Sequence, residues 1–349
     1  MHRRKFLEIS LGGAAAVAAA DLLAADVPAG KARIPIGFLG ASYSHGPGKI
    51  KIAMTSPDWE FVGACDSSEA GRKNCAELGA KLVSQEELFA RARVVAVESE
   101  IRDHAAQALL ALQAGKHVHI EKAPAMKLAD MQAVIALARE RKLLLQVGYM
   151  WRYHPGFMAI LEAARAGWLG QIYLVRGFIA NNLPAARRAE WAEFGGGSMF
   201  ELGSHLVDAA TRLLGKPKAV TPFLRHHGPF ADSLQDNNVA VLEYEHATAV
   251  LINTALQAGA TPQRSFEVLG TNGAATLQPI EPPTLTIDLA KAAGPYKKGL
   301  QQIPLPAYQR YEADFAALAA AVRGERELSV SLDEELIVEE TLLKVSGML

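Results

Sequence analysis

Residues 31–45 read KARIPIGFLGASYSH, an apolar strand that ends in a glycine and is followed by small and polar residues. Four further apolar stretches follow in the same rhythm, at residues 61–66, 93–99, 116–121 and 143–149. Amphipathic segments separate them, and one begins with Ser84-Gln85-Glu86-Glu87, a capping box that predicts a helix start. This alternation predicts a parallel sheet with helices on both faces and a ligand crevice at the carboxyl ends of its strands.

The pattern changes after residue 155. One helical stretch at 157–167 leads into short strands without long helices between them. The strands at 239–245 and 247–256 are expected to pair antiparallel, and the TNG sequence at 271–273 predicts a hairpin between two more. A capping box at 331–334 predicts the last helix. The second half is therefore expected to be an α+β domain with an open, mostly antiparallel sheet, whose outer face is free for solvent or another subunit.

Composition restricts the classes of function. The chain has 349 residues, half of them apolar, which is enough for two globular domains. Its formal net charge is only -1, and no long block of one charge sign suggests a nucleic-acid binder. Cys65 and Cys75 lack metal-ligand spacing, and the adjacent His226 and His227 have no accompanying ligand residues, so no metal site is expected. The expected partner is a small molecule.

Residues 1–30 differ from the rest. Arg3 and Arg4 precede an uncharged run from Ile9 to Ala20, an order that resembles a twin-arginine export signal. The run is shorter than the roughly 20 residues that span a bilayer, so no membrane span is expected. The sequence therefore predicts a periplasmic or secreted protein. It does not determine where the signal would be cleaved. The alternative is a cytoplasmic protein with an N-terminal tail.

The loop after the first strand has a nucleotide-binding pattern. Gly40, Ser42 and His45 occupy the three positions of a G-x-G-x-x-G fingerprint, with Tyr43 between them. The glycines of this motif allow a tight turn and close approach of the backbone to a pyrophosphate at a helix N-terminus. Ser42 keeps its position small and can donate to a phosphate, whereas His45 departs from the pattern. We therefore expect this loop to bind a dinucleotide.

Asp66 supports this expectation, because it ends the next predicted strand, where a carboxylate can accept hydrogen bonds from the adenosine ribose. A carboxylate there would repel a ribose phosphate, so NAD is favoured over NADP. The alternative is that Asp66 caps the following helix. The predicted fold is thus α/β, with a Rossmann dinucleotide-binding domain at 33–153 and a C-terminal substrate domain at 154–349. The C-terminal sheet is also expected to form a homo-oligomer.

Three further motifs make the pattern specific: GKHVHIEKAPA at 115–125, VGYMWRYHPGF at 147–157 and GGGSMFELGSHLVDAATRLLG at 195–215. With the fingerprint, they resemble the Gfo/Idh/MocA family, and the resemblance extends from about residue 33 to the C-terminus. It implies a Rossmann domain, a C-terminal open-sheet domain, and oxidation or reduction of sugars, polyols or related compounds with NAD or NADP.

The resemblance also implies site residues. Lys122, preceded by Glu121, matches the lysine of the family's E-K-P motif, although Ala123 precedes the proline here. It would lie beside the nicotinamide. The alternative is a solvent-exposed lysine at a strand end.

In the family pattern D-x-G-x-H-x-x-D, the histidine is the base and the first aspartate assists it. Here these positions are His205 and Glu201, with Asp208 following, and all three are expected on one face of a single helix. Two alternatives stay open: His205 could be a core histidine, and Glu201 could close a capping box with Ser198.

The family's T-P-x-x-x-H turn beside the nicotinamide becomes Ser99, Glu100 and His104. Ser99 and His104 are expected to contact the cofactor, and Glu100 would add a carboxylate near the ring. Arg152, Tyr153, Asp208 and the stretch at 181–194 are candidate substrate contacts.

The mechanism implied has His205 take a hydroxyl proton while hydride passes to the nicotinamide, and Lys122 stabilises the alkoxide or relays the proton. A second possibility follows from export, because free NAD is not expected outside the cytoplasm. A tightly held NAD would then serve a redox-neutral glycosidase, epimerase or lyase. A third is a sugar-binding relative without turnover.

Overall fold

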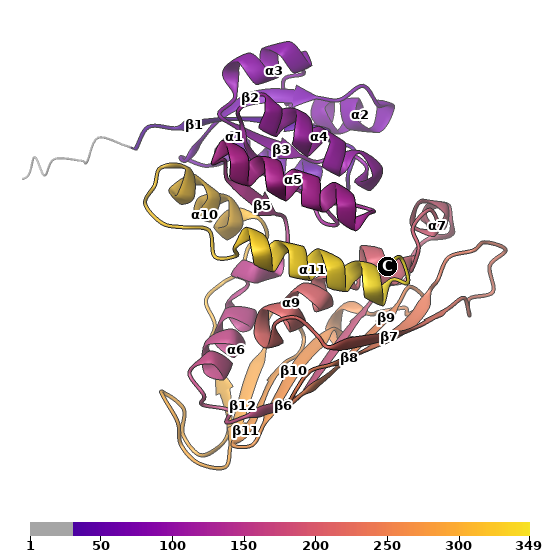
Figure 1. The fold of residues 1–349 in the computed structure, drawn as a ribbon, viewed down its shortest axis with the longest axis vertical. Helices are drawn as coiled ribbons and strands as arrows, with labels where there is room; N and C mark the ends of the chain where they lie inside the picture. The colour runs from indigo at the N-terminus through magenta and orange to yellow at the C-terminus, as the bar shows by residue number, and fades with distance from the viewer. Residues whose placement is uncertain (1–30) are drawn as a thin grey trace, which may run out of the picture.

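The computed structural model describes residues 31–349; the predicted export signal lies outside these residues. Two sheets form the molecule, with helices around the first and between the two (Figure 1). Within the described residues, no helix is both long and apolar enough to traverse a bilayer.

The first sheet is entirely parallel, in the order β2-β1-β3-β4-β5. Its strands are β1 (Ile34–Leu39), β2 (Trp59–Cys65), β3 (Val94–Val97), β4 (His117–Ile120) and β5 (Leu145–Val147). The surrounding helices are α1 (Gly46–Thr55), α2 (Glu69–Leu78), α3 (Gln85–Arg91), α4 (Ile101–Gln113) and α5 (Leu128–Arg141). All four residues of β3 are buried, as expected for a strand covered on both faces.

The strand order reverses between β1 and β3, and this is where a doubly wound sheet opens its ligand crevice. Gly40 follows β1 with a φ of 86°, and a Cβ there would lie 2.4 Å from the backbone nitrogen of Ser99. Only glycine fits so close an approach. The fingerprint glycine therefore allows the loops after β1 and β3 to meet at the crevice.

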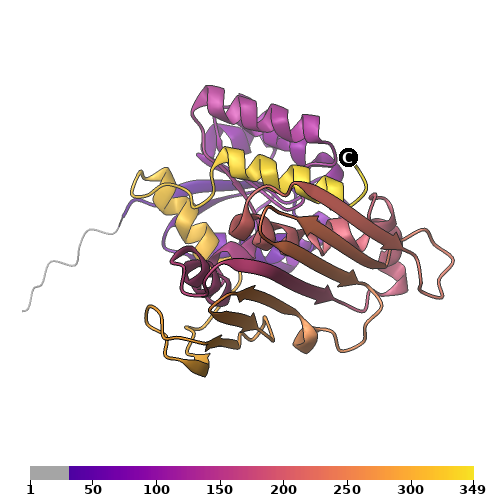
Figure 2. The same ribbon diagram turned by 60° about the horizontal axis from the view of Figure 1, so that its bottom comes forward.

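The second sheet is mostly antiparallel, in the order β13-β12-β11-β10-β6-β9-β8-β7. Its strands are β6 (Ile172–Ala180), β7 (Ala219–Arg225), β8 (Asn237–Glu243), β9 (Thr248–Thr254), β10 (Ser265–Gly270), β11 (Gly273–Leu277), β12 (Leu285–Leu289) and β13 (Gly299–Ile303). Buried residues alternate along β8, β9 and β10, so one face packs on the core. Figure 2 shows the open sheet from below.

The predicted fold class and both predicted strand pairs are confirmed. β8 pairs antiparallel with β9, and β10 with β11 across the TNG turn. The sequence did not predict that β6 and β9, far apart in the chain, pair in parallel at the middle of the sheet.

Helices link the two units. A 3-10 turn (Met150–Tyr153) leads into α6 (Pro155–Arg165), and α7 (Ala185–Ala192), α8 (Ser198–Glu201) and α9 (Ser204–Leu214) follow β6. The chain ends with α10 (Glu312–Val322) and α11 (Leu332–Val345), whose predicted capping box is present.

The C-terminal helices return to the first unit. Phe315 and Leu318 of α10 share a buried cluster with Phe38 and Trp59 of the first sheet. α11 lies between the units in Figure 1 and contributes Val338 to the core around α4 and α5. The strands of the first sheet thus all precede residue 153 and those of the second sheet all follow it. The helices do not divide in this way, because α10 and α11 follow residue 153 but pack on the first unit.

Candidate active site

Asp66 supports the loop after β1. Its Oδ2 accepts a hydrogen bond from the backbone N–H of Ala41 at 2.7 Å, and its Oδ1 accepts one from Ser68 N–H at 2.7 Å. Ser68, whose side chain accepts from Gly71 N–H, is the N-cap of α2, so the alternative that Asp66 is this cap is wrong. The carboxylate stays half-buried at the carboxyl end of β2, beside the crevice.

His45 has a partner that explains its place in the fingerprint. It is the N-cap residue of α1, and its Nδ1 lies 2.9 Å from Oε1 of Glu121 at the end of β4. The imidazole is therefore directed along the strand ends towards a carboxylate. A glycine at this position could not make the contact.

His104 joins the loops after β3 and β4. It is fully buried, with Nε2 2.9 Å from the Ser99 carbonyl and Nδ1 2.9 Å from the Ala123 carbonyl. Burial lowers its pKa, so the neutral ring donates to one carbonyl at a time. Ser99 donates its hydroxyl to Gln107 at 2.8 Å, and exposed Glu100 is the N-cap residue of α4.

Lys122 and Glu201 form an ion pair between the two units. The Lys122 side chain is buried, which contradicts the solvent-exposed alternative. Its Nζ lies 2.5 Å from Oε2 of Glu201 and 2.9 Å from the Glu201 carbonyl oxygen. The Tyr43 hydroxyl donates to the same carboxylate, at 2.8 Å from Oε1 and 2.9 Å from Oε2. Burial and the neighbouring carboxylate of Glu201 raise the pKa of Tyr43 well above its usual value.

The alternative that Glu201 closes a capping box with Ser198 is wrong. Gly197 is the N-cap residue of α8, and the Ser198 hydroxyl bonds to Asn253 and to the Gln235 carbonyl. The expected single helix is also wrong, because a turn separates α8 from α9. Glu201 therefore ends one helix and His205 lies in the first turn of the next.

His205 is buried beside the ion pair. Its ring packs against Trp151 and Tyr149, with centroids 4.9 and 6.1 Å away. Within residues 31–349, Nδ1 has no hydrogen-bond partner. Burial, followed by the electrostatic effect of the neighbouring Lys122 and His45, lowers the pKa of His205 well below its usual value. The ring is therefore neutral at physiological pH and has a nitrogen lone pair that can accept a proton.

A cavity of about 400 Å³ separates the two units at this point. Ser42, Tyr43 and Ser44 line it from the fingerprint loop, and Glu201 lines it from the end of α8. The remaining wall comes from Ala70, Glu100, Ile101 and Arg102, and from the α7 segment with Arg187, Glu190, Trp191, Glu193 and Phe194.

The α7 helix is anchored to the second unit. Arg188 is buried and forms ion pairs with Asp232 and Asp236, while its guanidinium lies 3.9 Å from the ring centroid of Phe230. The predicted substrate loop at 181–194 thus becomes a fixed wall of the cavity.

Three predicted substrate contacts do not line this cavity. Arg152 is buried and binds Asp208 through Nε at 2.9 Å and Nη2 at 2.8 Å, and Glu335 at 2.6 and 2.7 Å. Tyr153 accepts from Gln146 at 3.1 Å. Arg152 and Asp208 therefore belong to an ion-pair network that joins the 3-10 turn, α9 and α11.

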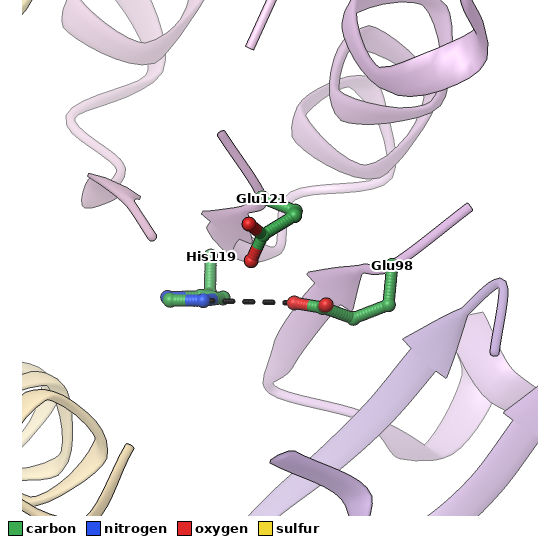
Figure 3. Close-up of side chains that lie close together, drawn as sticks. All are labelled: Glu98, His119 and Glu121. Atoms are coloured by element: carbon green, nitrogen blue, oxygen red, sulfur yellow. Dashed lines mark ion pairs between the residues drawn. The ribbon is translucent and has the colours of Figure 1, made fainter. Parts of the chain in front are cut away.

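A buried cluster below the crevice was not predicted. Glu98, His119 and Glu121 point towards one another from the ends of β3 and β4 (Figure 3). Their ligand atoms lie within 4.8 Å of one another, a set that could hold a metal ion. The Lys49 ammonium, however, bonds to all three, at 2.7 Å from Glu98 and 2.9 Å from His119. This lysine therefore supplies the cation of the cluster.

Charge in this cluster is unevenly distributed. Burial raises the pKa of Glu98 to about 8 and lowers that of His119 to about 3. Burial opposes ionisation of Glu121 as well, but Lys49 and His45 outweigh it and hold the pKa of Glu121 well below its usual value. Sequence inspection missed Lys49 because a lysine on α1 is ordinarily exposed, and only the fold turns it inward.

Comparison with known proteins agrees with this geometry. A family model described as an oxidoreductase family with an NAD-binding Rossmann fold matches residues 34–149, and the GFO/IDH/MocA C-terminal domain model matches residues 157–276. The predicted NAD-binding Rossmann domain is thus confirmed.

Curated relatives include 1,5-anhydro-D-fructose reductase of Ensifer adhaerens, 27% identical over 294 residues, which cover 82% of this chain and 84% of that protein. Inositol 2-dehydrogenase of Salmonella paratyphi B is 25% identical over 278 residues, covering 75% and 76%. These relatives are oxidoreductases of sugars and polyols.

Solved structures share the fold. UDP-N-acetylglucosamine 3-dehydrogenase GnnA of Acidithiobacillus ferrooxidans has a TM-score of 0.77 at 19% identity, covering 91% of this chain and 98% of its own. GenD2 from gentamicin A biosynthesis, solved in complex with NAD, has a TM-score of 0.75 at 23% identity, with coverage of 90% and 94%.

Proposed function

Because the chain belongs to the Gfo/Idh/MocA family of oxidoreductases, we propose that it transfers hydride between NAD and a hydroxyl-bearing carbon of a sugar or polyol. The observation that carries this proposal is the buried group of Lys122, Glu201 and His205, of which Glu201 lines the same cavity as the fingerprint loop. A paired lysine and a neutral histidine next to a dinucleotide loop provide the groups that alcohol oxidation requires.

The loop fits a dinucleotide. Gly40 allows close backbone approach, α1 begins directly after the loop, and the half-buried Asp66 lies where a ribose would be read. When bound, NAD supplies the hydride acceptor. Asp66 would favour NAD over NADP, because its negative charge repels a ribose phosphate.

The chain's own residues would handle the proton. His205 would accept it from the substrate hydroxyl, because its ring lies beside the Lys122–Glu201 pair and its Nδ1 has no partner among the described residues. Lys122 places a positive charge where an alkoxide develops, and Glu201 holds the ammonium in place. Phe194 and the anchored α7 helix form part of the wall of the cavity.

The activities of the curated relatives support this substrate class. We would assay the purified protein against 1,5-anhydro-D-fructose with NADH, and against myo-inositol and simple glucosides with NAD, following absorbance at the NADH band. Oxidation or reduction of at least one sugar or polyol is expected. Tight NAD binding with no turnover on any of them would instead favour a sugar-binding relative without activity.

A second candidate has NAD reduced and reoxidised within each catalytic cycle, as in a redox-neutral glycosidase, epimerase or lyase. It is favoured by the twin-arginine pattern of residues 1–30, which would export the folded protein to the periplasm, away from free NAD. The dialysed protein would then retain its dinucleotide and turn over without added NAD. Activity that strictly requires added NAD, with stoichiometric NADH release, would reject this candidate.

We also propose that the protein forms a homo-oligomer through its second sheet. The outer face of the second sheet exposes Tyr173 on β6 and Phe223 on β7, with 49% and 46% of their surfaces accessible. These side chains are consistent with a homo-oligomer formed through this sheet, and sedimentation of the purified protein would test it.

A further inference from the structure

Tyr43 connects the fingerprint loop of the first unit to the Glu201 carboxylate of the second. It lies between β1 and α1, whereas Glu201 is the last residue of α8. The phenol hydroxyl reaches both oxygens of the carboxylate, at 2.8 and 2.9 Å, and the contact is buried. A loop shaped for a dinucleotide thus carries a group that orients the carboxylate paired with Lys122.

The loop gives Tyr43 little freedom to move independently. Its backbone N–H donates to the Glu98 carbonyl at 3.2 Å, and its carbonyl accepts from Gly46 N–H at 2.9 Å. The ring meets His45 and His104 edge-on, with centroids 5.4 and 5.9 Å away. A displacement of the loop must therefore also displace the hydroxyl.

The carboxylate in turn depends on Tyr43. Glu201 accepts hydrogen bonds from two side chains, the Tyr43 phenol and the Lys122 ammonium. The ammonium also lies 5.3 Å from the centroid of the Tyr43 ring, so the three groups form one compact unit. Without the phenol hydroxyl, Lys122 alone would orient the carboxylate, and this end of the loop would lose its tie to α8.

We propose that Tyr43 is a positioning residue that couples dinucleotide binding to the orientation of the Glu201 carboxylate and, through it, of the Lys122 ammonium. The inference rests on the proposed function, because it requires that the loop binds NAD. Coupling between two sites is reciprocal. If bound NAD favours the loop position that places Tyr43 on Glu201, breaking this hydrogen bond must weaken NAD binding.

The test is a double-mutant cycle on NAD affinity. NAD dissociation constants are measured by calorimetry for the full-length wild-type protein, Tyr43→Phe, Glu201→Met and the double variant. Each single substitution is expected to weaken NAD binding by about tenfold, as for loss of a hydrogen bond to a charged group. The double variant should bind little more weakly than the weaker single variant, because both remove the same contact.

Two controls separate coupling from a structural role. Tyr173→Phe removes a hydroxyl from the exposed face of β6 and should leave NAD affinity unchanged. Thermal unfolding without NAD reports on folding of each variant, and should Glu201→Met fail to fold, the NAD affinity of Tyr43→Phe alone carries the test. A tyrosine that only supports the fold would change the unfolding midpoint but not NAD affinity.

The outcomes are distinguishable. Unchanged NAD affinity in Tyr43→Phe would overturn this inference and leave the proposed function intact. The same holds if the fold-change in the NAD dissociation constant of the double variant equals the product of the two single fold-changes. Failure of the wild-type protein to bind NAD would overturn the proposed function and this inference with it.

Discussion

The Arg152 network and the Lys122 pair look alike in burial and charge but differ in their surroundings. Arg152 divides its donors between Asp208 and Glu335, and none of the three lines the cavity between the units. Glu201, paired with Lys122, lines that cavity and lies close to His205, whose Nδ1 has no partner among the described residues. Burial and ion pairing therefore do not identify catalytic groups. The Lys122 pair differs in that Glu201 lines the cavity, and this is why we assign it, and not the Arg152 network, to the proposed site.

Removal of Arg152 is expected to have the largest effect on stability. Arg152→Ala would leave two carboxylates buried without a cation, and breaking such a pair costs roughly 3–5 kcal/mol of unfolding free energy. Urea unfolding would measure this loss. Arg139→Ala, which breaks an exposed pair with Asp333, is the control and should change stability little. A similar small change for Arg152→Ala would contradict its assignment as a structural residue.

His205→Asn and Lys122→Met are expected to have the largest effects on turnover. Loss of a positioned proton acceptor lowers the rate by roughly 10²–10⁴-fold, and loss of Lys122 should fall in the same range. NAD affinity should stay close to the wild-type value in His205→Asn, since His205 belongs neither to the fingerprint loop nor to the hydrogen-bonded unit of Tyr43, Glu201 and Lys122. The measurements are single-turnover rates with an active sugar and NAD binding by calorimetry. Unchanged rates in either variant would remove that residue from the mechanism.

His119 predicts a pH dependence of stability. Its pKa is about 3 in the fold and roughly 6.5 when unfolded, so the unfolded state binds more protons between these values. Its contribution to stability is fully present above about pH 6.5 and is lost as the pH falls towards 3. Each pH unit in this window corresponds to about 1.4 kcal/mol per group. His119→Gln should flatten the decrease measured by urea unfolding, and an unchanged slope would argue against a neutral buried ring.

Asp66→Ala is expected to have a smaller effect, on cofactor choice. It should weaken NAD binding by about tenfold through loss of hydrogen bonds to the ribose, and weaken NADP binding less. Calorimetry with each dinucleotide would show this, and Glu69→Ala, at the exposed start of α2, is the matched control. Equal or tighter NADP binding by the wild-type protein would contradict the role assigned to Asp66.

The sequence by itself determined the local structure and the family. Three features depend on only a few neighbouring residues: the glycine after β1, the turn at 271–273 and the cap at Ser331. Such local patterns can be recognised from a single sequence. The motif around Lys122 and the one around His205 identified the residues that the fold brings together beside the cavity.

Only the tertiary structure decided the partners of these residues. Glu201 could cap its own helix or pair elsewhere, and the choice depends on Tyr43 and Lys122, which are 158 and 79 positions away in the chain. Arg152 and Lys49 carry the same charge in the sequence whether they face substrate, solvent or buried carboxylates. Such contacts depend on which strand ends and helices meet when the two units pack, and local propensity carries no information about that packing.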